Sequence, residues 1–162
     1  MLQTNQVIYK SPTIAPNGAV IYGASGDGVA RAVLAAGQQL WDINLGLFES
    51  TMGAMTADGD HVLLASSSGL GKVEIATGKT VWSSNHESHI AAAEIVIDST
   101  GAAFVPNGHG ISFTKPDGGN TTNCNILDPS GSGFNSMVQL TIAGDGMILQ
   151  LSIHGMMNAF VG

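Results

Sequence analysis

The chain has 162 residues, of which 44% are hydrophobic, only 10% are charged and 22 are glycine. Low charge with high hydrophobic content argues against a disordered chain, and the length is that of one ordinary domain. The net charge of −7, with five Lys and Arg in all, argues against a nucleic-acid partner, because phosphate backbones require clustered basic side chains.

The remaining global features concern membranes, secretion and thiol chemistry. No apolar stretch approaches the roughly 18 residues that a membrane-spanning helix needs, so we expect no membrane span. Residues 1–6 lack the basic segment and apolar run of a secretory signal, which favours a cytoplasmic or virion-associated protein. Cys124 is the single cysteine and excludes an internal disulfide; we expect an ordinary strand residue rather than a reactive thiol.

A glycine-marked turn recurs four times along the chain. The turns end at Gly18, Gly59, Gly101 and Gly146, with spacings of 41, 42 and 45 residues. Each turn lies between two apolar-rich runs, which is the strongest local signal for a β-hairpin with a tight primed turn. The paired runs are residues 13–15 and 19–22, 52–57 and 61–65, 94–97 and 102–105, and 138–143 and 147–153.

Further strands follow each hairpin. Second glycine turns lead into third strands at residues 29–34, 72–75, 111–114 and 156–161. Fourth strands are expected at residues 38–41, 79–82 and 121–126, and the first two of these end in Trp41 and Trp82. A helix is the alternative only for residues 89–97, since no other window carries an apolar stripe with helical spacing.

Four antiparallel strands per repeat form a sheet that cannot bury both faces alone, whereas stacking such sheets around an axis does. The sequence therefore predicts an all-β fold, a single β-propeller domain over residues 1–162 with four four-stranded blades. The repeats are residues 11–49, 50–89, 90–131 and 132–162, and an N-terminal strand, residues 3–9, closes the last blade. Closure within one chain gives four blades, and closure between two chains gives an eight-bladed dimer. We favour the dimer, because such blades usually form larger rings.

Residues 73–82, which contain Gly78 and end in Trp82, resemble the Trp-docking repeat of pyrroloquinoline-quinone-type (quinoprotein-like) β-propellers. Residues 34–41 are a looser copy, and residues 11–18 resemble that family's blade opening. The resemblance implies that each Trp packs between neighbouring blades, and the third and fourth repeats have lost it. Enzymes of this superfamily bind quinone and Ca²⁺ beside adjacent cysteines, which this chain lacks, so we expect no cofactor.

Histidines are the main candidates for a ligand site. His86 and His89 flank a carboxylate, yet no third or fourth zinc ligand stands at a diagnostic spacing, so we expect a polar loop and no metal. His109 and His154 occupy equivalent places in the third and fourth repeats, where they could form a ligand-binding pair at one mouth of a ring. We expect no catalytic residues.

The aspartates of the glycine turns have their favoured structural role there. Trp41 and Trp82 could form a sugar platform, but packing between blades is the preferred interpretation. The predicted function is therefore a non-catalytic propeller that engages a protein or glycan partner or forms a homo-oligomeric structural assembly, such as a virion or appendage component. The alternative is a small hydrolase or lyase that uses polar residues at the propeller mouth.

Overall fold

The computed structural model describes residues 11–23, 28–44, 52–66, 69–85, 94–107, 110–119, 122–125, 137–144, 146–152 and 157–160. In these residues the regular secondary structure consists of β-strands, and none of them belongs to a helix that could cross a membrane. Residues 94–97 are not helical, because β9 (Val96–Ile97) lies there as a short strand.

The strands form four antiparallel sheets in chain order. Sheet 1 contains β1 (Thr13–Ile14), β2 (Val20–Gly23), β3 (Val29–Val33) and β4 (Gln39–Asn44). Sheet 2 contains β5 (Met52–Met55), β6 (His61–Ser66), β7 (Gly69–Glu74) and β8 (Thr80–Asn85). Sheet 3 contains β9, β10 (Ala103–Asn107), β11 (Gly110–Thr114) and β12 (Thr122–Asn125). Sheet 4 contains β13 (Met137–Ile142), β14 (Ile148–Ser152) and β15 (Met157–Phe160).

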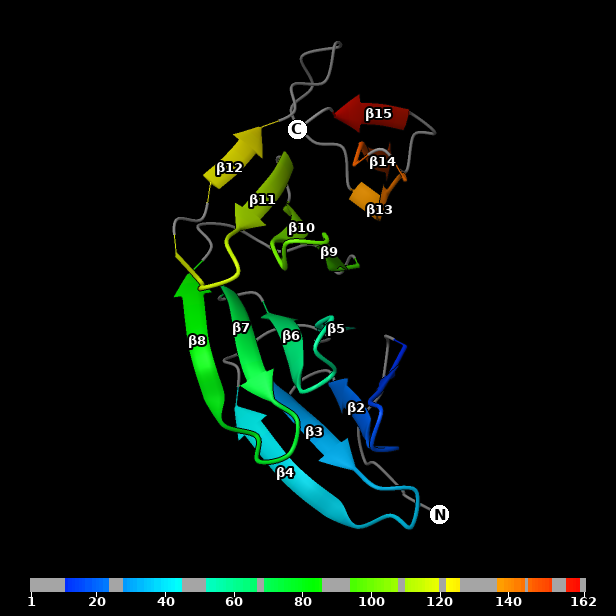
Figure 1. Ribbon diagram of the computed structural model, residues 1–162, viewed down its shortest axis with the longest axis vertical. Helices are drawn as coiled ribbons and strands as arrows, with labels where there is room; N and C mark the ends of the chain where they lie inside the picture. Colours follow the sequence, from blue (N-terminus) through cyan, green and yellow to red (C-terminus); the bar gives the residue numbers. More distant parts are fainter. Residues whose placement is uncertain are drawn as a thin grey trace.

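The four sheets follow one another along a curved row, with sheet 1 at one end and sheet 4 at the other (Figure 1). Sheets 1 and 2 touch through β1, β2 and β5, and sheets 3 and 4 touch through β9, β10 and β13. This radial stacking of antiparallel meanders confirms the predicted all-β propeller fold. The predicted closing strand, residues 3–9, lies outside the described residues.

Each gap between sheets holds its own apolar core. The first core joins Ile21 of sheet 1 to Val62 and Val73 of sheet 2. The second joins Leu63 of sheet 2 to Val105 of sheet 3, and the third joins sheets 3 and 4. Val62 and Leu63 are adjacent in β6 and point to opposite sides, because successive strand residues alternate. Every sheet therefore has a forward face toward the next sheet and a backward face toward the preceding one.

The glycine turns differ in one respect from the two-residue primed turn that the sequence predicted. In sheet 1 the N–H of Ala15 donates to the carbonyl of Ala19 at 2.8 Å, which encloses a three-residue loop. Gly18 ends this loop with a φ of 82°, the left-handed conformation that glycine adopts without a steric cost. Gly101 and Gly146 have the same conformation, and the loop that ends near Gly59 is one residue longer.

Candidate functional site

Trp41 joins sheets 1 and 2 at their outer strands. Its ring is only 7% exposed, and its Nε1–H donates to the carbonyl of Ile75 at 2.7 Å. The ring lies against Gly78, where an added Cβ would stand 2.6 Å from the ring carbon Cγ. Gly78 also has a φ of 74°, so the turn after β7 is shaped to receive this ring.

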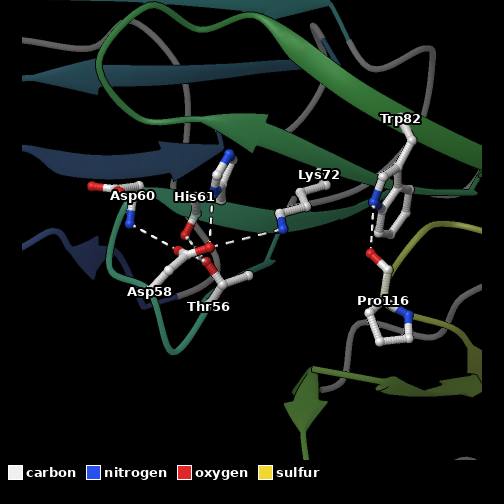
Figure 2. A network of polar contacts seen from close by, with 7 residues as sticks. All are labelled: Thr56, Asp58, Asp60, His61, Lys72, Trp82 and Pro116. Carbon is white, nitrogen blue, oxygen red and sulfur yellow. Dashed lines mark hydrogen bonds and ion pairs between the residues drawn. The ribbon is translucent and has the colours of Figure 1, made fainter. Parts of the chain in front are cut away.

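Trp82 makes the corresponding contact between sheets 2 and 3. Its Nε1–H donates to the carbonyl of Pro116 at 3.1 Å, as Figure 2 shows. Gly118 lies beneath the ring, and a Cβ there would stand 2.6 Å from the ring carbon Cδ2. Both indoles thus cover a turn of the following sheet, and this geometry leaves the buried Trp41 ring no open face on which a sugar could stack.

Asp58 is the centre of the polar network drawn in Figure 2. Its carboxylate accepts from the Thr56 hydroxyl at 2.6 Å, from the Asp60 backbone N–H at 2.9 Å and from His61 Nδ1 at 3.0 Å. Lys72 Nζ lies 3.9 Å away. The hydrogen bond from Thr56 above all, then those from Asp60 and His61, hold the pKa of Asp58 well below its usual range although partial burial raises it.

This network stabilises a turn and does not supply an acid or a base. A carboxylate with so low a pKa stays ionised at neutral pH, and its oxygens already accept the donors that shape the hairpin. Side chains in two other turns also accept backbone N–H groups: Asn17, the equivalent of Asp58, accepts from Ala19 at 3.0 Å, and Asp98, at the start of its turn, accepts from Thr100 and Ala102. For Asp98, burial raises the pKa, but these hydrogen bonds outweigh it and the pKa is lowered.

A cavity of about 250 Å³ lies between sheets 1 and 2 and is a candidate binding site. Its polar lining consists of one amide and four hydroxyls: Asn44, Ser66, Thr80, Ser83 and Ser84. Its apolar lining comes from Ile43, Leu64, Leu70 and Val73, and the glycines Gly69 and Gly71 complete it. Two of these hydroxyls donate within sheet 2, Ser66 to the Gly69 carbonyl at 3.4 Å and Ser84 to the Leu70 carbonyl at 3.5 Å. The lining combines polar groups with apolar contact, and it holds no side chain that titrates near neutral pH.

The lining of the cavity runs along β7, from Val73 and Thr80 to the end of the sheets where β6 turns into β7 at the Ser66–Gly69 pair. This end is opposite the glycine turns and the Asp58 network, because successive turns of an antiparallel meander alternate between the two ends. The small polar residues at strand ends are the one sequence signal for this cavity. The sequence holds no sign that Asn44 and Ser66, from different repeats, line one space.

The four candidate histidines, His86, His89, His109 and His154, lie outside the described residues. The strand ends that flank them, among them Asn107 paired with Gly110, belong to the same end of the sheets as the cavity. Cys124 lies on β12 opposite Ile111. Among the described residues, no group of three or more His, Cys, Asp or Glu side chains could hold a metal ion.

Comparison with known proteins identifies the fold. No protein-family model and no curated protein sequence matches the chain. The chain is similar to the computationally designed Ika4 protein, with 17% identity and a TM-score of 0.69 over all of both chains. It is also similar to virginiamycin B lyase from Staphylococcus aureus, with 14% identity and a TM-score of 0.66 over 92% of this chain and 54% of that chain.

A third similar structure is the WD40 β-propeller domain of Doa1, with 14% identity and a TM-score of 0.75 over 98% of this chain and 52% of that chain. At these identities the likeness defines the class of protein, an all-β propeller, and the fold alone. The chain spans about half the length of the lyase and of the Doa1 chain, and the whole of Ika4. The finer resemblance to quinoprotein-like repeats stays a prediction.

Proposed function

We propose that the chain is a non-catalytic propeller module that binds a neutral segment of a partner, a peptide or a glycan, and that assembles with copies of itself. The observation that carries the binding role is the cavity between sheets 1 and 2, where hydroxyls and an amide stand beside apolar side chains. Recognition sites combine apolar surface with a few oriented polar groups in this way. A structural component of a virion or appendage falls within this proposal.

The cavity is of a size to hold one side chain or one sugar ring rather than a large ligand, because drug-sized molecules fill larger spaces. Ser83 is exposed at its rim and Ser84 is half-buried, so a larger side chain at position 83 can fill the space without entering the core. Gly71 has room as well, since an added Cβ would first meet the Trp82 carbonyl at 3.8 Å.

The test uses a glycan array and a library of neutral peptides to find a ligand, followed by titration of variants. We expect Ser83→Leu to weaken binding at least roughly tenfold while the unfolding curve stays unchanged. Val81→Leu is the matched control, because Val81 is 52% exposed on the same strand and does not line the cavity. Equal affinities of the two variants for the ligand would show that the cavity is not the binding site.

A small hydrolase or lyase is the second candidate, and a lyase is among the proteins that share this fold. Its chemistry would come from His109 and His154, which the sequence pattern predicts to be equivalent residues of the third and fourth repeats. A turnover that His109→Ala or His154→Ala abolishes, with the fold intact by circular dichroism, would replace the binding proposal by this one.

A further inference from the structure

The two end sheets each keep a face that no other described sheet covers. Among the described residues no sheet precedes sheet 1 and none follows sheet 4, and the two lie at opposite ends of the row (Figure 1). The backward face of sheet 1 and the forward face of sheet 4 are therefore the only blade faces in the described part of the chain that lack a neighbouring blade. These two faces are called the end faces below.

The end face of sheet 1 repeats a surface that is covered in sheet 2. Ile14 pairs with Val20 as Met55 pairs with Val62, so Ile14 and Met55 are equivalent residues. Met55 packs against the core between sheets 1 and 2, whereas Ile14 is 70% exposed and is the most exposed of the large hydrophobic residues described. Both positions carry large apolar side chains, and only Met55 has a preceding sheet to pack against.

The Trp-receiving turn is repeated on this face as well. In residues 34–37 the N–H of Gly37 donates to the carbonyl of Leu34 at 2.8 Å, as the N–H of Gly118 donates to the carbonyl of Lys115 at 2.9 Å. Gly37 has a φ of 83°, close to the 74° of Gly78 and the 80° of Gly118. Ala35 is the equivalent in this turn of Ile75 and Pro116, whose carbonyls accept a hydrogen bond from a Trp in the other two turns. Ala35 itself is exposed.

The end face of sheet 4 is equivalent to the face of sheet 1 that packs on sheet 2. Thr13 pairs with Ile21 as Thr141 pairs with Leu149. The Thr13 hydroxyl donates across the sheet gap to the carbonyl of Gly53 at 2.7 Å. The equivalent hydroxyl, on Thr141, is exposed at the end of the row.

We propose that a second copy of this chain covers both end faces. The backward face of sheet 1 in each copy packs on the forward face of sheet 4 in the other, so that two half-rings form one closed propeller. At their first strands the two surfaces are the two kinds that already meet between sheets 1 and 2, and each copy carries one of each. This proposal names the surface for the self-assembly in the proposed function and rests on that part of it alone.

The lengths of the similar propellers agree with two copies. This chain covers 52% of the Doa1 chain and 54% of the lyase chain, so a second copy supplies what a ring of that size still needs. A head-to-tail contact closes into a ring when the rotation between copies allows it, and two copies then share two identical interfaces. Ile14, Pro12 and the turn at residues 34–37 become buried in that ring.

The first test is the mass of the chain in solution by sedimentation or native mass spectrometry. We expect twice the chain mass of 16.5 kDa. Ile14→Glu places a carboxylate in each of two apolar interfaces and should raise the dissociation constant at least about a hundredfold. Val81→Glu is the matched control, because Val81 is also a large exposed hydrophobic residue but lies on the outer strand of sheet 2, away from both end faces.

Three outcomes of this test would overturn the proposal: a wild-type monomer at micromolar concentration, a larger open-ended assembly, or equal dissociation of the two variants. Circular dichroism of each variant separates dissociation from unfolding. The search for a glycan or peptide ligand is a separate experiment, so its failure does not affect the mass measurement. A monomeric mass, in turn, does not affect the proposal that the cavity binds a ligand.

The second test joins the end faces covalently and needs no destabilising variant. Within the chain, an added Cβ at Gly53 would stand 3.0 Å from the Thr13 hydroxyl, and Pro12 and Thr141 are the equivalents of Gly53 and Thr13 at the end faces. In a Cys124→Ser background, Pro12→Cys with Thr141→Cys should therefore form a disulfide between chains on mild oxidation. Each single-cysteine variant is the control.

The masses of the oxidised product decide between the arrangements. A covalent dimer with two disulfides supports the two-chain ring. A monomer with an internal disulfide means that one chain closes on itself, a ladder of multiples means an open filament, and no disulfide means that the end faces do not meet; each of these three results overturns the proposal.

Discussion

Gly78 shows how one residue sets the distance between two sheets. Its φ of 74° and the 2.6 Å approach of the Trp41 ring both exclude a side chain. We expect Gly78→Ala to lower the free energy of unfolding by roughly 2–4 kcal/mol, from left-handed strain together with overpacking. Urea unfolding followed by Trp fluorescence measures this.

Gly18→Ala is the control that separates the two causes. Gly18 has a similar φ of 82°, but an added Cβ there would meet nothing within 4 Å. It should therefore cost only the conformational part, about 1 kcal/mol. Equal losses for the two variants would show that the ring contact at Gly78 carries no energy.

The lowered pKa of Asp58 predicts how the stability of the folded state changes in acid. Its folded pKa lies below the unfolded value of 3.8, so the folded state binds this proton less readily than the unfolded chain. The stabilisation is therefore present above pH 3.8 and is lost as the pH falls below it. Because Asp58 is 45% exposed, solvent screening keeps the effect small, under about 1 kcal/mol.

Asp58→Asn tests this with little change of shape, since Asn17 makes the same backbone hydrogen bond in sheet 1. We expect the variant to lose less stability than the wild type between neutral pH and about pH 3 in urea titrations. An unchanged slope for Asp58→Asn would contradict the assignment.

At the scale of the elements, the outer strand of one sheet is attached to a turn of the next. Trp41→Phe keeps an aromatic ring but leaves the Ile75 carbonyl without its donor in a buried site. We expect a loss of about 1–3 kcal/mol, the cost of an unsatisfied buried acceptor. Trp82→Phe should cost less, because its bond to Pro116 is longer, at 3.1 Å, and is exposed to water. Thermal unfolding of both variants gives the order, and the reverse order would contradict this account.

The elements themselves were largely readable from the sequence. Gly18 and Gly59 mark hairpins because a left-handed residue is a local requirement, so the predicted and observed strands agree to within a few residues. The cavity between sheets 1 and 2 was not readable. Asn44 and Ser83 line it from different repeats, and no local pattern states that two sheets place their strand ends side by side.

The whole molecule is a one-dimensional stack in which each sheet contacts only its neighbours within the described residues. Trp41 and Trp82 belong to different sheet gaps and share no partner. The double variant with both residues changed to Phe should therefore lose the sum of the two single losses, to within about 0.5 kcal/mol. A double-mutant cycle measures the difference between the double loss and the sum of the single losses. A coupling energy well above about 0.5 kcal/mol would mean that the two sheet gaps are energetically coupled.

The sequence by itself determined the strands, their order within each sheet and the turns that join them, because a hairpin depends on residues a few positions apart. Only the tertiary structure decided which face of each sheet meets the next, that Trp41 reaches a carbonyl 34 residues away, and that Ile14 lies exposed on an end face while Met55 is covered. These contacts depend on how whole sheets stack, since alternating side chains give every strand two apolar faces and leave the choice of neighbour to packing.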